Sequence, residues 1–91
     1  MTGGYDFGAI RIIQTSPANA WTSRMAFYTM NGYGGALIER MAIDNSGNVG
    51  IGTTAPGSKL SIVGLPTSSA GLSAGDIWVD TTGGLNILKI K

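Results

Sequence analysis

The stretch WTSRMAFYTMNGYGGALIERMAI, residues 21–43, decides the fold because it holds two strand-like segments around a turn. Residues 21–30 alternate their side chains between two faces, and the run NGYGG at 31–35 supplies turn-forming residues. Residues 36–43 are rich in helix formers and fit either period, but eight residues without a cap make a poor helix. We therefore predict a strand over 36–43 that pairs with residues 24–30.

Strand signals continue on both sides of this hairpin. Residues 7–15 are rich in Ile and end at the turn-forming run SPANA. After the turn DNSGN, the runs VGIG and KLSIV at 49–52 and 59–63 alternate large with small or polar side chains. The chain is expected to close with two apolar runs around DTTGG, a hairpin in which Gly83 and Gly84 take positive φ. The prediction is an all-β chain with three parts: a β-rich module at 1–63, a Gly/Ser loop at 64–75 and a C-terminal β-hairpin at 76–91.

The composition restricts how so small a chain can be stabilised. It has 91 residues, of which 15 are glycine, so a single core would be marginal. Small domains usually add disulfides, metals or oligomerisation. There is no Cys and no His, which excludes disulfides and the usual zinc, iron and copper ligand sets. We therefore expect oligomerisation, with no metal and no cofactor.

The charge and hydropathy patterns restrict the partners. A formal net charge of +1 gives no electrostatic reason to expect nucleic acid or an anionic membrane. No run of about 18 apolar residues is present, so membrane insertion is not expected. Charged residues make up 12% of the chain, about half the usual share, so the surface must include exposed apolar groups. A monomer with such a surface would tend to associate through its exposed apolar groups.

Three short motifs match functional patterns but lack the context those patterns need. Residues 50–55 match the dinucleotide fingerprint G-x-G-x-x-A, yet Pro56 and Gly57 follow where a helix should begin. Residues 71–75 match G-x-S-x-G, but no His can serve as the base. Residues 44–48 resemble part of a calcium loop without its terminal Glu, so they are expected to form a turn.

No pair of carboxylates stands at a spacing suited to acid–base catalysis, so we do not expect an enzyme. Glu39 is expected to form a solvated or interchain charge pair beside Arg40. Trp78 lies between two apolar strand residues, which favours a core or subunit-interface position. Trp21 and Tyr33 lie in or beside loops, and their flat amphipathic rings make them candidate receptor-binding residues.

The run ERMAIDNSGNVGIGTTAPGSKLSIVG, residues 39–64, resembles the E-R-M-x-I-D-x-S-G-N-V-G-I-G-T-T-x-P-x-x-x-L-x-V segment of bacteriophage tail fibre and tail spike proteins. Weaker similarity extends upstream through RMAFYTMNGYGG and downstream into a segment that looks like the C-terminal tip of such fibres. The resemblance implies short strands and hairpins in an intertwined, fibrous homotrimer. It also implies assembly in the host cytoplasm and a place in the virion beside other tail or baseplate proteins.

The resemblance gives a functional expectation: a structural tail fibre or fibre-tip module that presents a host-recognition surface, with a host cell-surface glycan as a candidate receptor. The alternative is a small, non-catalytic, lectin-like glycan-binding module. Triple β-helix, triple β-spiral and globular β-knob architectures all fit the strand pattern. In each, Val49 and Ile51 are expected to point into packed material, while Gly50 and Gly52 let a second backbone approach at the trimer contact.

Overall fold

The structure is a computed structural model that describes residues 7–16 and 21–91. The described residues contain seven strands, one 3₁₀ turn at Thr82–Gly84 and no α-helix, which confirms the predicted all-β class. Residues 64–75 contain neither strand nor helix. The strands are β1 Gly8–Gln14, β2 Ser23–Met30, β3 Leu37–Ile43, β4 Val49–Ile51, β5 Leu60–Ile62, β6 Ile77–Asp80 and β7 Ile87–Ile90.

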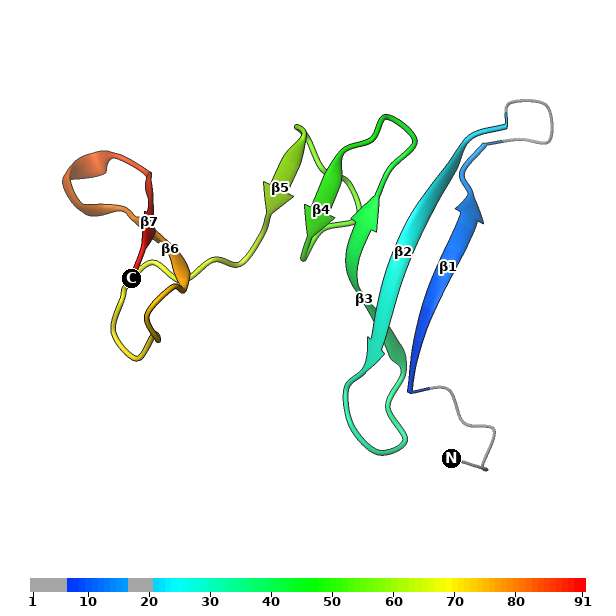
Figure 1. Ribbon diagram of the computed structural model, residues 1–91, viewed down its shortest axis with the longest axis horizontal. Helices are drawn as coiled ribbons and strands as arrows, with labels where there is room; N and C mark the ends of the chain where they lie inside the picture. The colour runs from blue at the N-terminus through cyan, green and yellow to red at the C-terminus, as the bar shows by residue number, and fades with distance from the viewer. Residues whose placement is uncertain (1–6, 17–20) are drawn as a thin grey trace.

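The strands form two separate sheets (Figure 1). The larger sheet has the order β1-β2-β3-β4-β5, and its strands are antiparallel except for the parallel pair β4–β5. The smaller sheet is the antiparallel hairpin β6–β7. Pairing of Met25 with Ile43 and of Met30 with Leu37 confirms the hairpin predicted within residues 21–43.

A β-bulge in β3 controls which face Glu39 occupies. Phe27 pairs with Met41 and the next residue, Tyr28, pairs with Glu39, so Arg40 is one residue more than the partner strand needs. Strict alternation would place Glu39 on the same face as Met41, because the side-chain period of a strand is two. The extra residue shifts Glu39 to the opposite face, beside Tyr28.

The parallel pair β4–β5 is joined by an unusually short crossover. Residues 52–59 make this connection with eight residues, whereas a parallel crossover usually needs about a dozen or more. The crossover bends back over β4, so that a Cβ at Gly50 would lie only 2.5 Å from the carbonyl oxygen of Thr53. Gly52 has φ +76°, and a Cβ there would lie 2.7 Å from the carbonyl oxygen of Val63. Both glycines are therefore required by contacts within the chain.

The C-terminal hairpin is held by hydrogen bonds within it and to the loop 64–75, where the Pro66 carbonyl accepts from the Val79 N–H at 2.8 Å. The backbone N–H groups of Gly75 and Lys91 donate to the carbonyls of Lys91 and Asp76, which closes the open end of the hairpin. Gly83 and Gly84 have φ values of 72° and 77°, as predicted for its turn. Trp78 is half-buried, and its cross-strand partner Lys89 places its ammonium 5.4 Å from the ring centroid.

The chain is one layer thick. It measures 48 × 38 × 18 Å, and the hairpin lies beside the five-stranded sheet rather than on it (Figure 1). Its radius of gyration is 16.8 Å, against about 12 Å for a compact domain of this length. Among the apolar side chains that the structure describes, only those of Ala26, Ala42 and Pro56 are buried. A single chain therefore has almost no hydrophobic core.

Candidate functional site

The two faces of the five-stranded sheet differ in chemistry, and the register defines both. Two rows of cross-strand neighbours share one face, which we call the apolar face. The rows are Ile10, Phe27, Met41, Ile51, Ile62 and Ile12, Met25, Ile43, Val49, Leu60. The row between them points the other way and contains Arg11, Ala26, Ala42, Gly50 and Ser61. Together with Ile13, Arg24, Tyr28 and Glu39, this row forms the polar face, on which Ile13 is the large aliphatic side chain beside Arg24.

The polar face carries a charged network. Arg24 donates from Nη1 to both carboxylate oxygens of Glu39, at 2.6 and 2.7 Å, and the Tyr28 hydroxyl donates to the same carboxylate at 3.0 Å. The hydrogen bond to Glu39 raises the pKa of the Arg24 guanidinium. The guanidinium carbon of Arg11 lies 4.8 Å from the centroid of the Tyr28 ring, at a cation–π distance.

The predicted pairing of Glu39 is therefore wrong. Its partner is Arg24 of the neighbouring strand in the same chain, and its side chain is only 9% exposed. Arg40 instead donates from Nε to the hydroxyl of Thr29 at 2.8 Å. The bulge explains the difference. It places the Glu39 side chain beside Tyr28 of β2, and it leaves Arg40 without a partner residue in the β2–β3 register.

The polar face is covered by its own chain. Arg24 precedes Ala26 by two residues and reaches Glu39, which lies beyond Ala42 on β3, so the ion pair spans the two buried alanines. Further along the same row, the crossover packs over Gly50, and Pro56 in that crossover is buried. Small side chains in the middle row make room for this cover.

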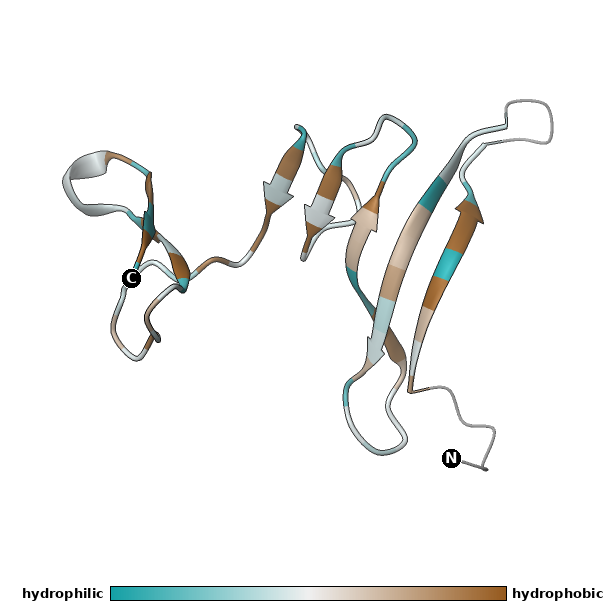
Figure 2. Cartoon of the chain, viewed as in Figure 1, coloured by the Kyte–Doolittle hydropathy of each residue, from teal (hydrophilic) through white to brown (hydrophobic). Residues whose placement is uncertain are grey.

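The apolar face has no equivalent cover. Ile10 and Ile12 on β1 are 68% and 65% exposed, and Leu60 on β5 is 57% exposed. The residues on the central strands are at best half-buried by their neighbours in the sheet. Figure 2 shows hydrophobic residues on every strand of this sheet. The charged Arg11 of β1 belongs to the middle row and so lies on the opposite face. Within residues 7–16 and 21–91, no segment covers this face of ten apolar residues.

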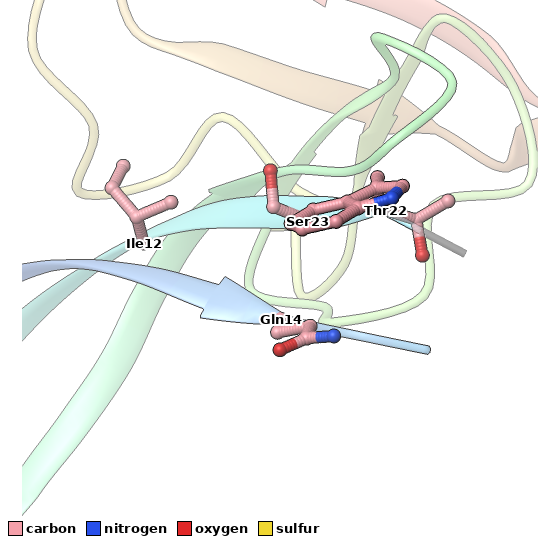
Figure 3. A pocket seen from close by; sticks show the side chains of 5 residues that line it. Ile12, Gln14, Thr22 and Ser23 are labelled. Atoms are coloured by element: carbon pink, nitrogen blue, oxygen red, sulfur yellow. The ribbon is translucent and has the colours of Figure 1, made fainter. Parts of the chain in front are cut away.

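A shallow hollow of about 320 Å³ lies at one end of the apolar face (Figure 3). Trp21 lines it with 90% of its surface exposed and a φ of +35°, a rare conformation for an aromatic residue. Gln14 and Ser23 form the cross-strand pair that ends the apolar face, and their exposed polar side chains line the hollow too. An aromatic ring beside an amide and a hydroxyl can bind a ring that has one apolar side and polar edges.

The two predicted receptor-binding residues lie far apart. Tyr33 is fully exposed in the turn between β2 and β3, whereas Trp21 precedes β2. The eight residues of β2 separate them by about 25 Å. One small ligand cannot contact both residues of the same chain.

The four residues predicted at the trimer contact, at positions 49–52, do not share one face of the sheet. Val49 and Ile51 lie on the apolar face, which is uncovered in the single chain, so their direction toward packed material stays a prediction. Gly50 lies on the polar face and Gly52 follows the strand, and the backbone that approaches each belongs to the same chain. A role for these glycines in a trimer contact stays a prediction, since their contacts within the chain already require them.

In residues 7–16 and 21–91 no group of three or more His, Cys, Asp or Glu side chains could hold a metal ion. Over the same residues, no helix has the length and apolar character needed to cross a membrane. No protein-family model and no curated protein sequence matches the chain.

Proposed function

We propose that the chain is a structural bacteriophage virion protein: a non-catalytic, homotrimeric tail fibre or fibre-tip module that presents a host-recognition surface. The observation that carries the proposal is a one-layer sheet with one uncovered apolar face. The resemblance of residues 39–64 to tail fibre segments supports the assignment to a virion. Neighbouring tail or baseplate proteins are its proposed attachment partners.

The exposed area supports assembly into a ring of subunits. The chain exposes 6579 Å², against about 5,000 Å² for a compact monomer of the same mass, an excess of about 1,600 Å². A standard interface buries about 800 Å² on each partner. The excess therefore corresponds to two interfaces per chain, and each subunit of a cyclic trimer makes two contacts.

Sedimentation at low micromolar concentration tests the assembly. The expected species has three times the chain mass of 9.3 kDa and loses its β-structure as it dissociates. A folded monomer over this concentration range would contradict the proposal, because one chain buries too little apolar surface to offset its conformational entropy.

A lectin-like glycan-binding module is the second candidate, and the hollow beside Trp21 favours it. Three such sites on one trimer would bind a repetitive glycan through avidity even if each site bound weakly. A glycan array tests this with Trp21→Ala and Tyr33→Ala as separate variants, since the structure places the residues at opposite ends of β2. We expect loss of binding for Trp21→Ala alone; equal binding by wild type and this variant would remove the hollow from the receptor site.

A further inference from the structure

We propose that the apolar face is the surface on which the three subunits pack against one another, and that the polar face is turned to solvent. This inference rests on the proposed homotrimer and adds to it the orientation of every strand. Either face could be directed inward in a trimer of flat sheets. Four observations favour the apolar face.

The first observation is the continuity of the apolar face. Its two rows cross all five strands and contain ten apolar residues with no charged side chain among them. Monomeric proteins rarely expose a contiguous apolar patch of more than a few hundred Å². Removal of such a surface from water on association is favourable.

The second observation is that the polar face is already occupied. The Arg24–Glu39 ion pair lies over the buried alanines, and the crossover packs over Gly50. Packing a subunit there would remove charged side chains from water without giving them new partners, which is costly. The polar face therefore has less apolar surface to gain and more hydration to lose.

The third observation concerns the occupant, which we infer to be a second copy of this chain. An uncharged apolar surface complements another surface of the same kind, and each copy presents one. The chain as a whole exposes about 1,600 Å² more than a compact monomer of its mass, and the apolar rows supply part of that excess. The ten residues of the face offer no charge to a nucleic acid or a strongly charged protein, and Arg40, which donates to Thr29 beyond Phe27, places one charge at its edge.

The fourth observation is where the face ends. Gln14 pairs with Ser23, so the polar side chains of this pair close the apolar rows at the end that carries Trp21. Interfaces typically have an apolar centre and a polar rim. Subunits packed through the apolar rows would thus leave the hollow at the rim of the contact, where a ligand can reach it.

Paired single-cysteine variants test the orientation, because the chain has no Cys of its own and each variant therefore carries a single thiol. Ile10 and Arg11 are neighbours on β1, both are exposed in the single chain, and they lie on opposite faces. The experiment measures the rate at which a maleimide labels Ile10→Cys and Arg11→Cys in the assembled protein and again in denaturant. Sedimentation of each variant establishes its oligomeric state first.

In the trimer we expect Ile10→Cys to react at least about tenfold more slowly than Arg11→Cys, with equal rates in denaturant. Equal rates in an intact trimer, or a slower Arg11→Cys, would overturn the inference and leave the proposed homotrimer standing. A wild-type monomer would contradict the homotrimer and the inference with it. Protection of Ile10→Cys in such a monomer would show that another part of the same chain covers the face.

Discussion

The two faces of the five-stranded sheet show how one chain can satisfy one surface and leave the other bare. Successive side chains of each strand point to the two faces in turn. The polar face has small residues at Ala26, Ala42 and Gly50, and other side chains and the β4–β5 crossover fill the space above them. The apolar face has a large side chain at every position of its two rows. Side-chain size in the middle row, rather than hydropathy alone, decides which face the chain covers by itself.

Placing a charge at the centre of the apolar face should have the largest effect. Phe27→Lys puts an ammonium where the proposed subunits meet, and an uncompensated buried charge costs about 3–5 kcal/mol for each subunit. We expect the trimer to be lost at micromolar concentration in sedimentation experiments, whereas the apolar control Phe27→Leu should keep it. A stable Phe27→Lys trimer would mean that the apolar face is not the subunit contact.

Adding one methyl group to the polar face should have the next largest effect. In Gly50→Ala the new Cβ would lie 2.5 Å from the Thr53 carbonyl oxygen and 3.1 Å from its Cγ2, so the crossover must move. Overpacking of this kind costs about 1–3 kcal/mol. Urea unfolding at fixed protomer concentration should show this loss. Gly57→Ala is the matched control, since nothing lies within 4 Å of its added Cβ, and an equal loss there would refute the close approach.

Removing the charge that covers the alanines should have a moderate effect. Arg24→Met keeps a long side chain over Ala26 but leaves the Glu39 carboxylate without its ion pair. Hydrogen bonds to charged groups contribute about 1.5–3 kcal/mol to stability. A double-mutant cycle with Glu39→Gln measures the coupling, which we expect to be about 1–2 kcal/mol. A coupling near zero would show that the pair does not stabilise the polar face.

The C-terminal hairpin should show the smallest effect, and it depends on neither face. Hydrogen bonds from Lys89 and Thr82 hold the pKa of the Asp80 carboxyl well below its ordinary value. A carboxyl whose pKa is lower in the folded state stabilises that state fully at a pH above its pKa in the unfolded chain, which is about 3.9. This stabilisation is lost as the pH falls toward the pKa in the folded state. In a Trp21→Phe background, Trp78 fluorescence should therefore report weakening of the hairpin below about pH 4.

The matched control for this titration is Asp80→Asn, which removes the titrating group from the hairpin. We expect the difference in hairpin stability between the two proteins to shrink as pH falls. A difference that stays constant from pH 6 to pH 2 would show that Asp80 does not stabilise the folded hairpin through its charge.

The sequence predicted the strands well because their signals are local. Alternation and turn residues located the hairpin of residues 21–43 and the tight turn at Gly83 and Gly84. The register could not be predicted in the same way. The bulge that sends Glu39 to Arg24 depends on how two strands pair, and the close approach at Gly50 depends on a crossover that folds back in space.

Prediction of the candidate site was less complete for a related reason. Trp21 and Tyr33 were singled out by residue type and loop position, which are local properties, but their separation follows from the direction of β2. The polar neighbours Gln14 and Ser23 were missed, because they come from different strands and meet only through the β1–β2 register. Their place at the end of two apolar segments was the signal that could have found them.

The bulge at Arg40 also determines how the sheet tolerates changes in chain length. Removing one residue from a regular strand sends every later side chain to the wrong face. Deletion of Arg40 would instead bring Met41 next to Glu39 in the order in which β2 already pairs with them. It would remove the side-chain hydrogen bond to Thr29 and the backbone hydrogen bond that the Arg40 carbonyl accepts from Gly52. This one position in the middle of a strand can therefore accept a single-residue deletion while every other residue of β3 keeps its neighbours.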